Sequence, residues 1–335
     1  MEIPIKDLTF LFGLIFVFFI GIGIYLIYRR TKTQKAQRGE HYDLKSLMLP
    51  YDKKLPLKQN LANIFVSPYF WIIEFIVLAL LSYFVVSDYI LGESREDVLL
   101  AFFASGLVSL GFTFIYTIVI WYIDHDEPEP LRFIPTLFLW GSFAALMAII
   151  MNTEILGWIE SNWPGSGETT LVLFVAPLLE EFLKALGLFA LFYHKEFDDT
   201  MDGIFYGFLV GMGFAFIEDW SYYIFYSPFE LGIGQWLELI FVRTVATGAG
   251  HGIFTAITGA LLGLVKTGHI SKRGFLSILL ISAIVHFLFN LLGFANAIAQ
   301  VNVQILGMVI LIGLLFVGIK MALSKYKKKQ KKTIP

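Results

Sequence analysis

Residues 176–184 have the sequence Ala-Pro-Leu-Leu-Glu-Glu-Phe-Leu-Lys, which places two carboxylates and an ammonium group within an otherwise apolar stretch. A charged side chain at the centre of a bilayer costs about 2.5–3.5 kcal/mol on insertion scales, so three of them within five residues require a reason. Lys184 follows Glu180 by four positions and Glu181 by three, so all three groups lie along one helical face. A salt bridge to Lys184 accounts for only one of the two carboxylates.

The composition of the whole chain predicts a membrane protein. Its 335 residues are 57% hydrophobic and 16% charged, with a mean hydropathy of +0.72, whereas soluble proteins carry about 25% charged residues. Apolar runs of about 20 residues recur, which is typical of an all-α, polytopic transmembrane helical bundle. The chain has no cysteine, which excludes disulfides, thiolate metal ligands and a cysteine nucleophile.

Apolar runs divide the chain into candidate spans. We predict nine, near residues 8–28, 69–91, 98–122, 133–152, 171–193, 203–226, 247–265, 275–297 and 302–322. The expected organisation is a first span in 1–28, a basic cytoplasmic linker in 29–68, a multi-span core in 69–300 that carries the motifs of 176–290, and a last span with a lysine-rich cytoplasmic tail in 301–335.

The distribution of Lys and Arg orients these spans. Residues 29–60 hold nine of them, the tail from Lys320 holds seven and 266–273 holds three, whereas 92–97 has one and 153–170 has none. Basic loops stay in the cytoplasm, so we expect the N-terminus outside and the C-terminus in the cytoplasm. The N-terminus lacks the basic region of a cleavable signal peptide, so the first span is expected to remain.

Two local patterns predict how helices pack. Glycines recur every four residues on the sixth and seventh spans, and such faces let helices approach closely; they are Gly203, Gly207 and Gly211, and Gly259 and Gly263. Residues 229–245 have the pattern of an amphipathic helix at the membrane interface.

Further ionisable residues lie at the depth of the two glutamates. Glu218 is near the outer part of the sixth span, His251 is near the outer start of the seventh, and His286 and Asn290 lie one turn apart on the eighth. At 1.5 Å per residue, all of them fall in the outer half of the bilayer or near its midplane. Four helices therefore bring carboxylates, imidazoles and an amide together, which favours a functional site.

Each of these groups also has a structural interpretation. Glu181 and Lys184 would form an intrahelical salt bridge, and Glu218 with Asp219 would be a polar end of a span wetted by headgroups. His251 would form a hydrogen bond between helices, and His286 with Asn290 would be a structural polar pair. An ion or proton pathway would use the same residue types.

Carboxylates and imidazoles together are suited to activating water, either directly as general bases or through a metal ion. His251, His286 and Glu218 would form a two-histidine, one-carboxylate set that suits a divalent metal such as zinc. Asn290 would donate to a developing oxyanion. The sequence leaves the metal-dependent and the glutamic mechanism open.

These motifs resemble those of the PrsW intramembrane proteases, a branch of the CAAX-protease and bacteriocin-processing superfamily. The matching residues are Glu180-Glu181-Phe182-Leu183-Lys184, Phe214-x-x-x-Glu218, His251 and His286-x-x-x-Asn290, in order on successive spans. The resemblance covers residues 120–295 and implies a helical core of the CAAX-protease/PrsW type that hydrolyses a peptide bond. The CAAX branch usually has His in place of Glu218 and Arg one residue after Lys184, and both differences favour PrsW.

The resemblance also implies roles and partners. Glu180 and Glu181 would be the acid/base pair with Lys184 tuning their charge, the histidines would polarise water or bind metal, and Glu218 would be a second acid or a ligand. The implied substrate is a membrane-anchored protein cut near the outer face of the bilayer, as in site-one cleavage of an anti-sigma factor in the bacterial cytoplasmic membrane. The expected partners are this substrate and the lipid bilayer, with no nucleic acid.

Two other functions remain open at this point. One is a non-proteolytic scaffold, because the superfamily is similar to the Aph subunit of gamma-secretase. The presence of both glutamates and both histidines argues against a site that has lost its catalytic residues. The other is a proton- or cation-coupled transporter. Transporters usually have repeated halves, and no such halves are evident in this sequence.

Overall fold

The computed structural model describes residues 53–67, 69–70, 72–74, 76–77, 95–123, 133–226, 231–246, 248–271 and 275–299, together with residue 313. The predicted first span, nearly all of the last span, the second half of the span at 69–91 and most of the basic linker and tail lie outside these residues. All regular secondary structure in the described residues is helical, which confirms the all-α prediction.

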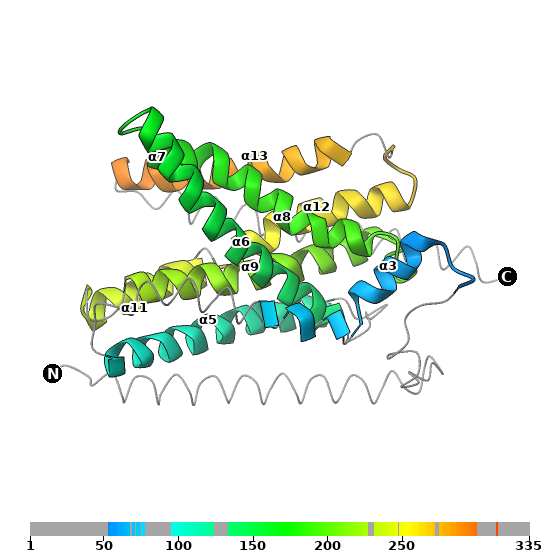
Figure 1. Cartoon of the computed structure of the whole chain (residues 1–335), viewed down its shortest axis with the longest axis horizontal. Helices are drawn as coiled ribbons and strands as arrows, with labels where there is room; N and C mark the ends of the chain where they lie inside the picture. Colours follow the sequence, from blue (N-terminus) through cyan, green and yellow to red (C-terminus); the bar gives the residue numbers. More distant parts are fainter. Residues whose placement is uncertain are drawn as a thin grey trace.

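The described residues form a bundle of helices (Figure 1). They are α3 (Leu57–Phe65), α5 (Arg95–Ile123), α6 (Phe133–Asn162), α7 (Gly167–Thr170), the π-helix η1 (Leu171–Val175), α8 (Ala176–Leu191), α9 (Thr200–Phe225), α11 (Ile233–Phe241), the π-helix η2 (Val242–Ala246), α12 (Gly250–Lys266) and α13 (Phe275–Ala299).

Within the described residues, four helical stretches are long and apolar enough to cross a membrane. They are Phe102–Trp121, Phe133–Asn162, Thr200–Phe225 and Leu276–Gly293, and they match four of the predicted spans. The helix α12 is apolar but shorter. The prediction of a polytopic helical membrane protein is therefore supported, and the count of nine spans stays a prediction.

Helix α9 is the centre of the bundle. It packs against α5, α6, α8 and α12, and α5, α9, α12 and α13 run roughly alongside one another while α6 and α8 cross them obliquely (Figure 1). Phe205 and Leu209 of α9 are fully buried. A helix that is apolar on all sides is expected in such a central position.

The predicted glycine face lies between α9 and α12. A Cβ atom added at Gly203, Gly207 or Gly211 would run into the backbone of α12, and at Gly211 the atom that it would meet is the carbonyl oxygen of His251. Backbone therefore lies directly on backbone, as small-residue faces allow. This contact fixes the position of His251 relative to α9.

Helices α6 and α9 also contact each other through glycines, in the first half of α6 and near the middle of α9. A Cβ at Gly141 would meet the backbone of Val210, and one at Gly213 would meet the backbone of Phe138. The Ser142 hydroxyl donates to the carbonyl of Gly213 over 3.1 Å. These contacts hold the two helices together on the N-terminal side of Glu218 along α9.

The amphipathic helix predicted at 229–245 corresponds to α11 and η2, which together run from Ile233 to Ala246. Helix α11 begins after Gly232, whose φ of 77° only glycine adopts readily, and η2 follows it directly. Trp236 is buried and donates through Nε1 to the carbonyl of Tyr223 over 3.1 Å. Trp236 therefore anchors α11 against Tyr223 of α9.

Candidate functional site

Glu181 is the most highly coordinated side chain of the site. Its Oε1 lies 2.6 Å from Lys184 Nζ and 3.2 Å from His286 Nδ1. Its Oε2 accepts from Ser282 Oγ over 2.9 Å and from Thr255 Oγ1 over 3.3 Å. Because a buried carboxylate needs such partners, Glu181 can remain inside the protein with 1% of its side chain exposed.

Lys184 connects Glu181 to the first of the two histidines. Its side chain is fully buried, and Nζ lies 2.9 Å from His251 Nδ1 and 4.0 Å from the centre of the Phe214 ring. An ammonium group can only donate, so Nδ1 of His251 accepts and Nε2 carries the proton. Lys184 thereby sets the tautomer of His251.

Glu181 sets the opposite tautomer at His286. A carboxylate without a proton can only accept, so Nδ1 of His286 donates to Glu181 and Nε2 keeps a lone pair. The imidazole stacks on Phe254 with a ring distance of 4.7 Å and an interplanar angle of 23°. Nε2 lies 4.0 Å from Glu180 Oε2, so the lone pair is on the side of Glu180.

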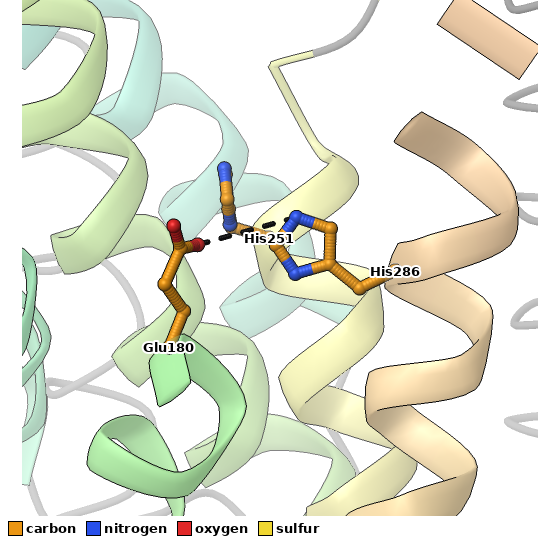
Figure 2. Close-up of side chains that lie close together, drawn as sticks. All are labelled: Glu180, His251 and His286. Atoms are coloured by element: carbon orange, nitrogen blue, oxygen red, sulfur yellow. Dashed lines mark ion pairs between the residues drawn. The ribbon is translucent and has the colours of Figure 1, made fainter. Parts of the chain in front are cut away.

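Glu180, His251 and His286 come from α8, α12 and α13 and point toward one another (Figure 2). One ligand atom from each lies within 4.8 Å of those of the other two. Glu180 keeps 12% of its side chain exposed, and it lines a cavity of about 230 Å³ together with Glu218. The adjacent glutamates thus have different surroundings: one faces the cavity and the other is enclosed.

Glu218 belongs to a second charged group on α9 and η2. Its Oε1 accepts from an Arg243 terminal nitrogen over 3.0 Å, while Arg243 Nε donates to Asp219 over 2.8 Å. The Arg243 guanidinium also lies 3.6 Å from the centre of the Tyr222 ring. Glu218 Oε2 is 2.5 Å from His251 Nε2, and because Nε2 carries the proton in the tautomer set by Lys184, His251 and Glu218 face each other as donor and acceptor.

The donor set suits a divalent ion. Two imidazoles and a carboxylate are a common protein ligand set for zinc, and a carboxylate behind a ligating histidine, as Glu181 is behind His286, is the usual support for such a ligand. The predicted metal set contained Glu218, whereas the geometry groups Glu180 with the histidines. Ligation through Nε2 of His251 would require the Lys184 contact at Nδ1 to change.

Asn290 lies outside this centre. Its Nδ2 donates to the carbonyl of Val172 in η1 over 2.9 Å. The sequence predicted that this amide donates to an oxyanion, whereas here one of its N–H groups connects α13 to η1. Thr255 and Ser282, which donate to Glu181, were not predicted from the sequence. Both lie one turn from a histidine, four residues after His251 and four before His286, and this spacing was the available signal.

The fold and the site together define a helical membrane protein with a buried glutamate–histidine centre. A family model described as PrsW family intramembrane metalloprotease matches residues 129–318, which is more than half of the chain. The chain therefore belongs to the PrsW family, and the resemblance found in the motifs is confirmed.

Individual relatives agree with this assignment. Protease PrsW of Oceanobacillus iheyensis is 28% identical over 179 residues, which cover 52% of this chain and 77% of the relative. Protease PrsW of Geobacillus kaustophilus is 29% identical over 154 residues, or 46% and 63%. Protease PrsW of Clostridioides difficile is 32% identical over 148 residues, or 43% and 59%. The alignments with the last two span less than two thirds of those proteins. No solved structure matches this chain.

Proposed function

We propose that this chain hydrolyses a peptide bond of a membrane-anchored protein in the outer half of the bilayer. The observation that carries the proposal is the convergence of Glu180, His251 and His286 from three helices, with ligand atoms within 4.8 Å, beside a cavity. Burying such groups in a membrane protein is costly, and family membership gives the chemistry that they would serve.

Each residue of the centre would have a distinct task. Glu180, His251 and His286 would hold a divalent ion such as zinc, which when bound polarises a water molecule and the scissile carbonyl. Glu181 would keep the Nε2 lone pair of His286 directed at the centre. Glu218 would accept the proton from water, because Arg243 holds its Oε1 while Oε2 lies toward the centre, 2.5 Å from His251 Nε2.

Two tryptophans at the C-terminal end of α6 support a position of the site near one membrane–water interface. Trp158 and Trp163 are exposed and in edge-to-face contact, as is typical of tryptophans at the headgroup level. Asn152 lines the cavity six residues before Trp158, or about 9 Å deeper along the helix. Cleavage at that depth suits a single-span substrate, and site-one cleavage of an anti-sigma factor is the proposed case.

The test compares new protein N-termini in cells that contain the wild-type protein or Glu180→Gln at equal membrane levels. Glu168→Gln is the matched control, since Glu168 is an exposed glutamate. We expect a membrane-anchored protein to be cut near its outer membrane boundary with the wild type and the control, but not with Glu180→Gln. The same termini in all three samples would contradict the protease assignment and favour a scaffold.

A further inference from the structure

The cavity beside Glu180 and Glu218 has walls from several helices. Helix α6 contributes one side, including Ala148, Ile149 and Asn152, and α9 contributes Phe214 and Tyr222 on the other. Leu171 of η1 also lines it. Two carboxylates of the proposed catalytic centre, Glu180 and Glu218, are part of the same lining, so whatever occupies the cavity lies next to the reacting groups.

The size of this cavity suits part of a polypeptide. Its volume is about 230 Å³. A cavity of about 150 Å³ holds a benzene ring, and pockets for whole small-molecule ligands usually measure about 300–1,000 Å³. The space therefore accommodates about one side chain with its peptide group.

The lining explains what kind of residue would enter. Most of the wall is apolar: Ala145, Ala148, Ile149, Leu156 and Leu171. Ala148 is almost completely buried, with 1% exposure, and it lies on the same α6 wall as the larger Ile149. An apolar side chain is favoured in such surroundings, and the small alanine leaves room for a large one.

Asn152 adds a polar group to this wall. Its side chain interacts electrostatically with Glu180, and its Oδ1 is buried without a hydrogen-bond partner in the part of the chain that the structure describes. A substrate helix must unwind before its peptide bond can be attacked, and the freed backbone N–H groups then need acceptors within the membrane. Asn152 Oδ1 is such an acceptor.

We propose that this cavity is the subsite for the substrate residue beside the cleaved bond, that it takes one large apolar side chain, and that Ala148 and Ile149 set the size accepted. Asn152 accepts a backbone N–H of the same substrate segment. The inference rests on the proposed function, because it assigns a place to the substrate of the centre formed by Glu180, His251 and His286.

The test uses purified full-length protein and a membrane-anchored substrate whose cut has been mapped. The residue on either side of the cut is changed in turn to Ala, Leu and Phe, and kcat/KM is measured for each. One added or missing methylene changes discrimination by about 10–200-fold in a hydrophobic pocket. We expect Ala148→Leu to lower cleavage of the Phe substrate relative to the Ala substrate by at least tenfold, and Ile149→Ala to shift the preference the opposite way.

The neighbouring Ile150 provides the control, because it is the same residue type on the same helix but does not line the cavity. Ile150→Ala should leave the order of substrates unchanged. The same order in all variants would overturn the subsite. If the wild type cleaves none of the substrates, or if Glu180→Gln cleaves them equally well, the proposed function itself fails.

Asn152 is tested with the same substrates. Asn152→Ala should lower kcat/KM for all of them by a similar factor, because every substrate has the same backbone N–H, and Asn152→Asp should restore part of the loss by keeping an acceptor oxygen. A change in the order of substrates, or an unchanged kcat/KM in Asn152→Ala, would overturn the backbone contact.

Discussion

Lys184 Nζ lies 2.6 Å from Glu181 Oε1, and the two side chains are 0% and 1% exposed. Removing one partner of a buried ion pair leaves an uncompensated charge and typically costs about 3–5 kcal/mol, whereas replacing both by apolar groups is often neutral. Loss of one partner is therefore expected to affect folding as well as the alignment of the histidines, and the two effects can be separated.

Glu181→Gln should destabilise the protein by about 3–5 kcal/mol, because the Lys184 ammonium loses its counter-ion. The double variant Glu181→Gln, Lys184→Met should recover much of this stability but remain inactive, because His286 no longer has its carboxylate partner. Unfolding in detergent and cleavage of a membrane-anchored substrate measure the two quantities. A stable, fully active Glu181→Gln variant would contradict the assigned role.

His286→Ala should reduce the amount of divalent metal that co-purifies with the protein and should abolish cleavage, because the carboxylate-backed imidazole is one of three proposed ligands. Elemental analysis of the purified protein measures the metal without depending on activity. His269→Ala is the control, since His269 is an exposed histidine at the other end of α12. Equal metal content in both variants would contradict the ligand set.

Gly211→Ala should lower both activity and stability, because its new Cβ would run into the His251 carbonyl and displace the backbone of α12. Gly157→Ala is the opposite case: a Cβ there would meet no atom of the described residues within 4 Å, and Ala is more favourable than Gly within a helix by about 0.8–1.0 kcal/mol. Thermal unfolding and cleavage assays of both variants check this contrast. Equal behaviour would show that the glycine contact does not position His251.

Asn290→Ala separates two roles for this amide. Loss of an oxyanion donor costs about 10²–10³ in kcat, whereas loss of a single hydrogen bond to the Val172 carbonyl costs about 1 kcal/mol of stability. Since the structure shows the bond to Val172, we expect the smaller change and a kcat within about tenfold of the wild type. A decrease of a hundredfold in a folded variant would restore the oxyanion role.

The sequence was informative about the centre because ionisable side chains within a membrane are costly. Glu180, Glu181 and Lys184 could be placed on one helix, and their convergence with His251 and His286 could be predicted from depth alone. The division of roles between the two glutamates could not. Neighbouring helical residues point about 100° apart, and only the packing of α12 and α13 against α8 decides which carboxylate is enclosed.

The two π-helices could not be predicted either. Residues 171–175 are Leu-Val-Leu-Phe-Val, and such a run has no feature that distinguishes five residues of π-helix from the continuation of an α-helix. Their positions next to the site, η1 before Glu180 and η2 carrying Arg243, agree with the frequent occurrence of π-bulges at functional sites.

The glycine contacts of α9 have a consequence for movement. Since α9 meets α12 and the first half of α6 backbone to backbone, no layer of side chains separates them that would let one helix slide past another, and the three form one rigid frame. Under the proposed function, a membrane-anchored substrate would therefore reach the centre without separating α9 from α12. His251 belongs to this frame and would keep its position while the substrate binds.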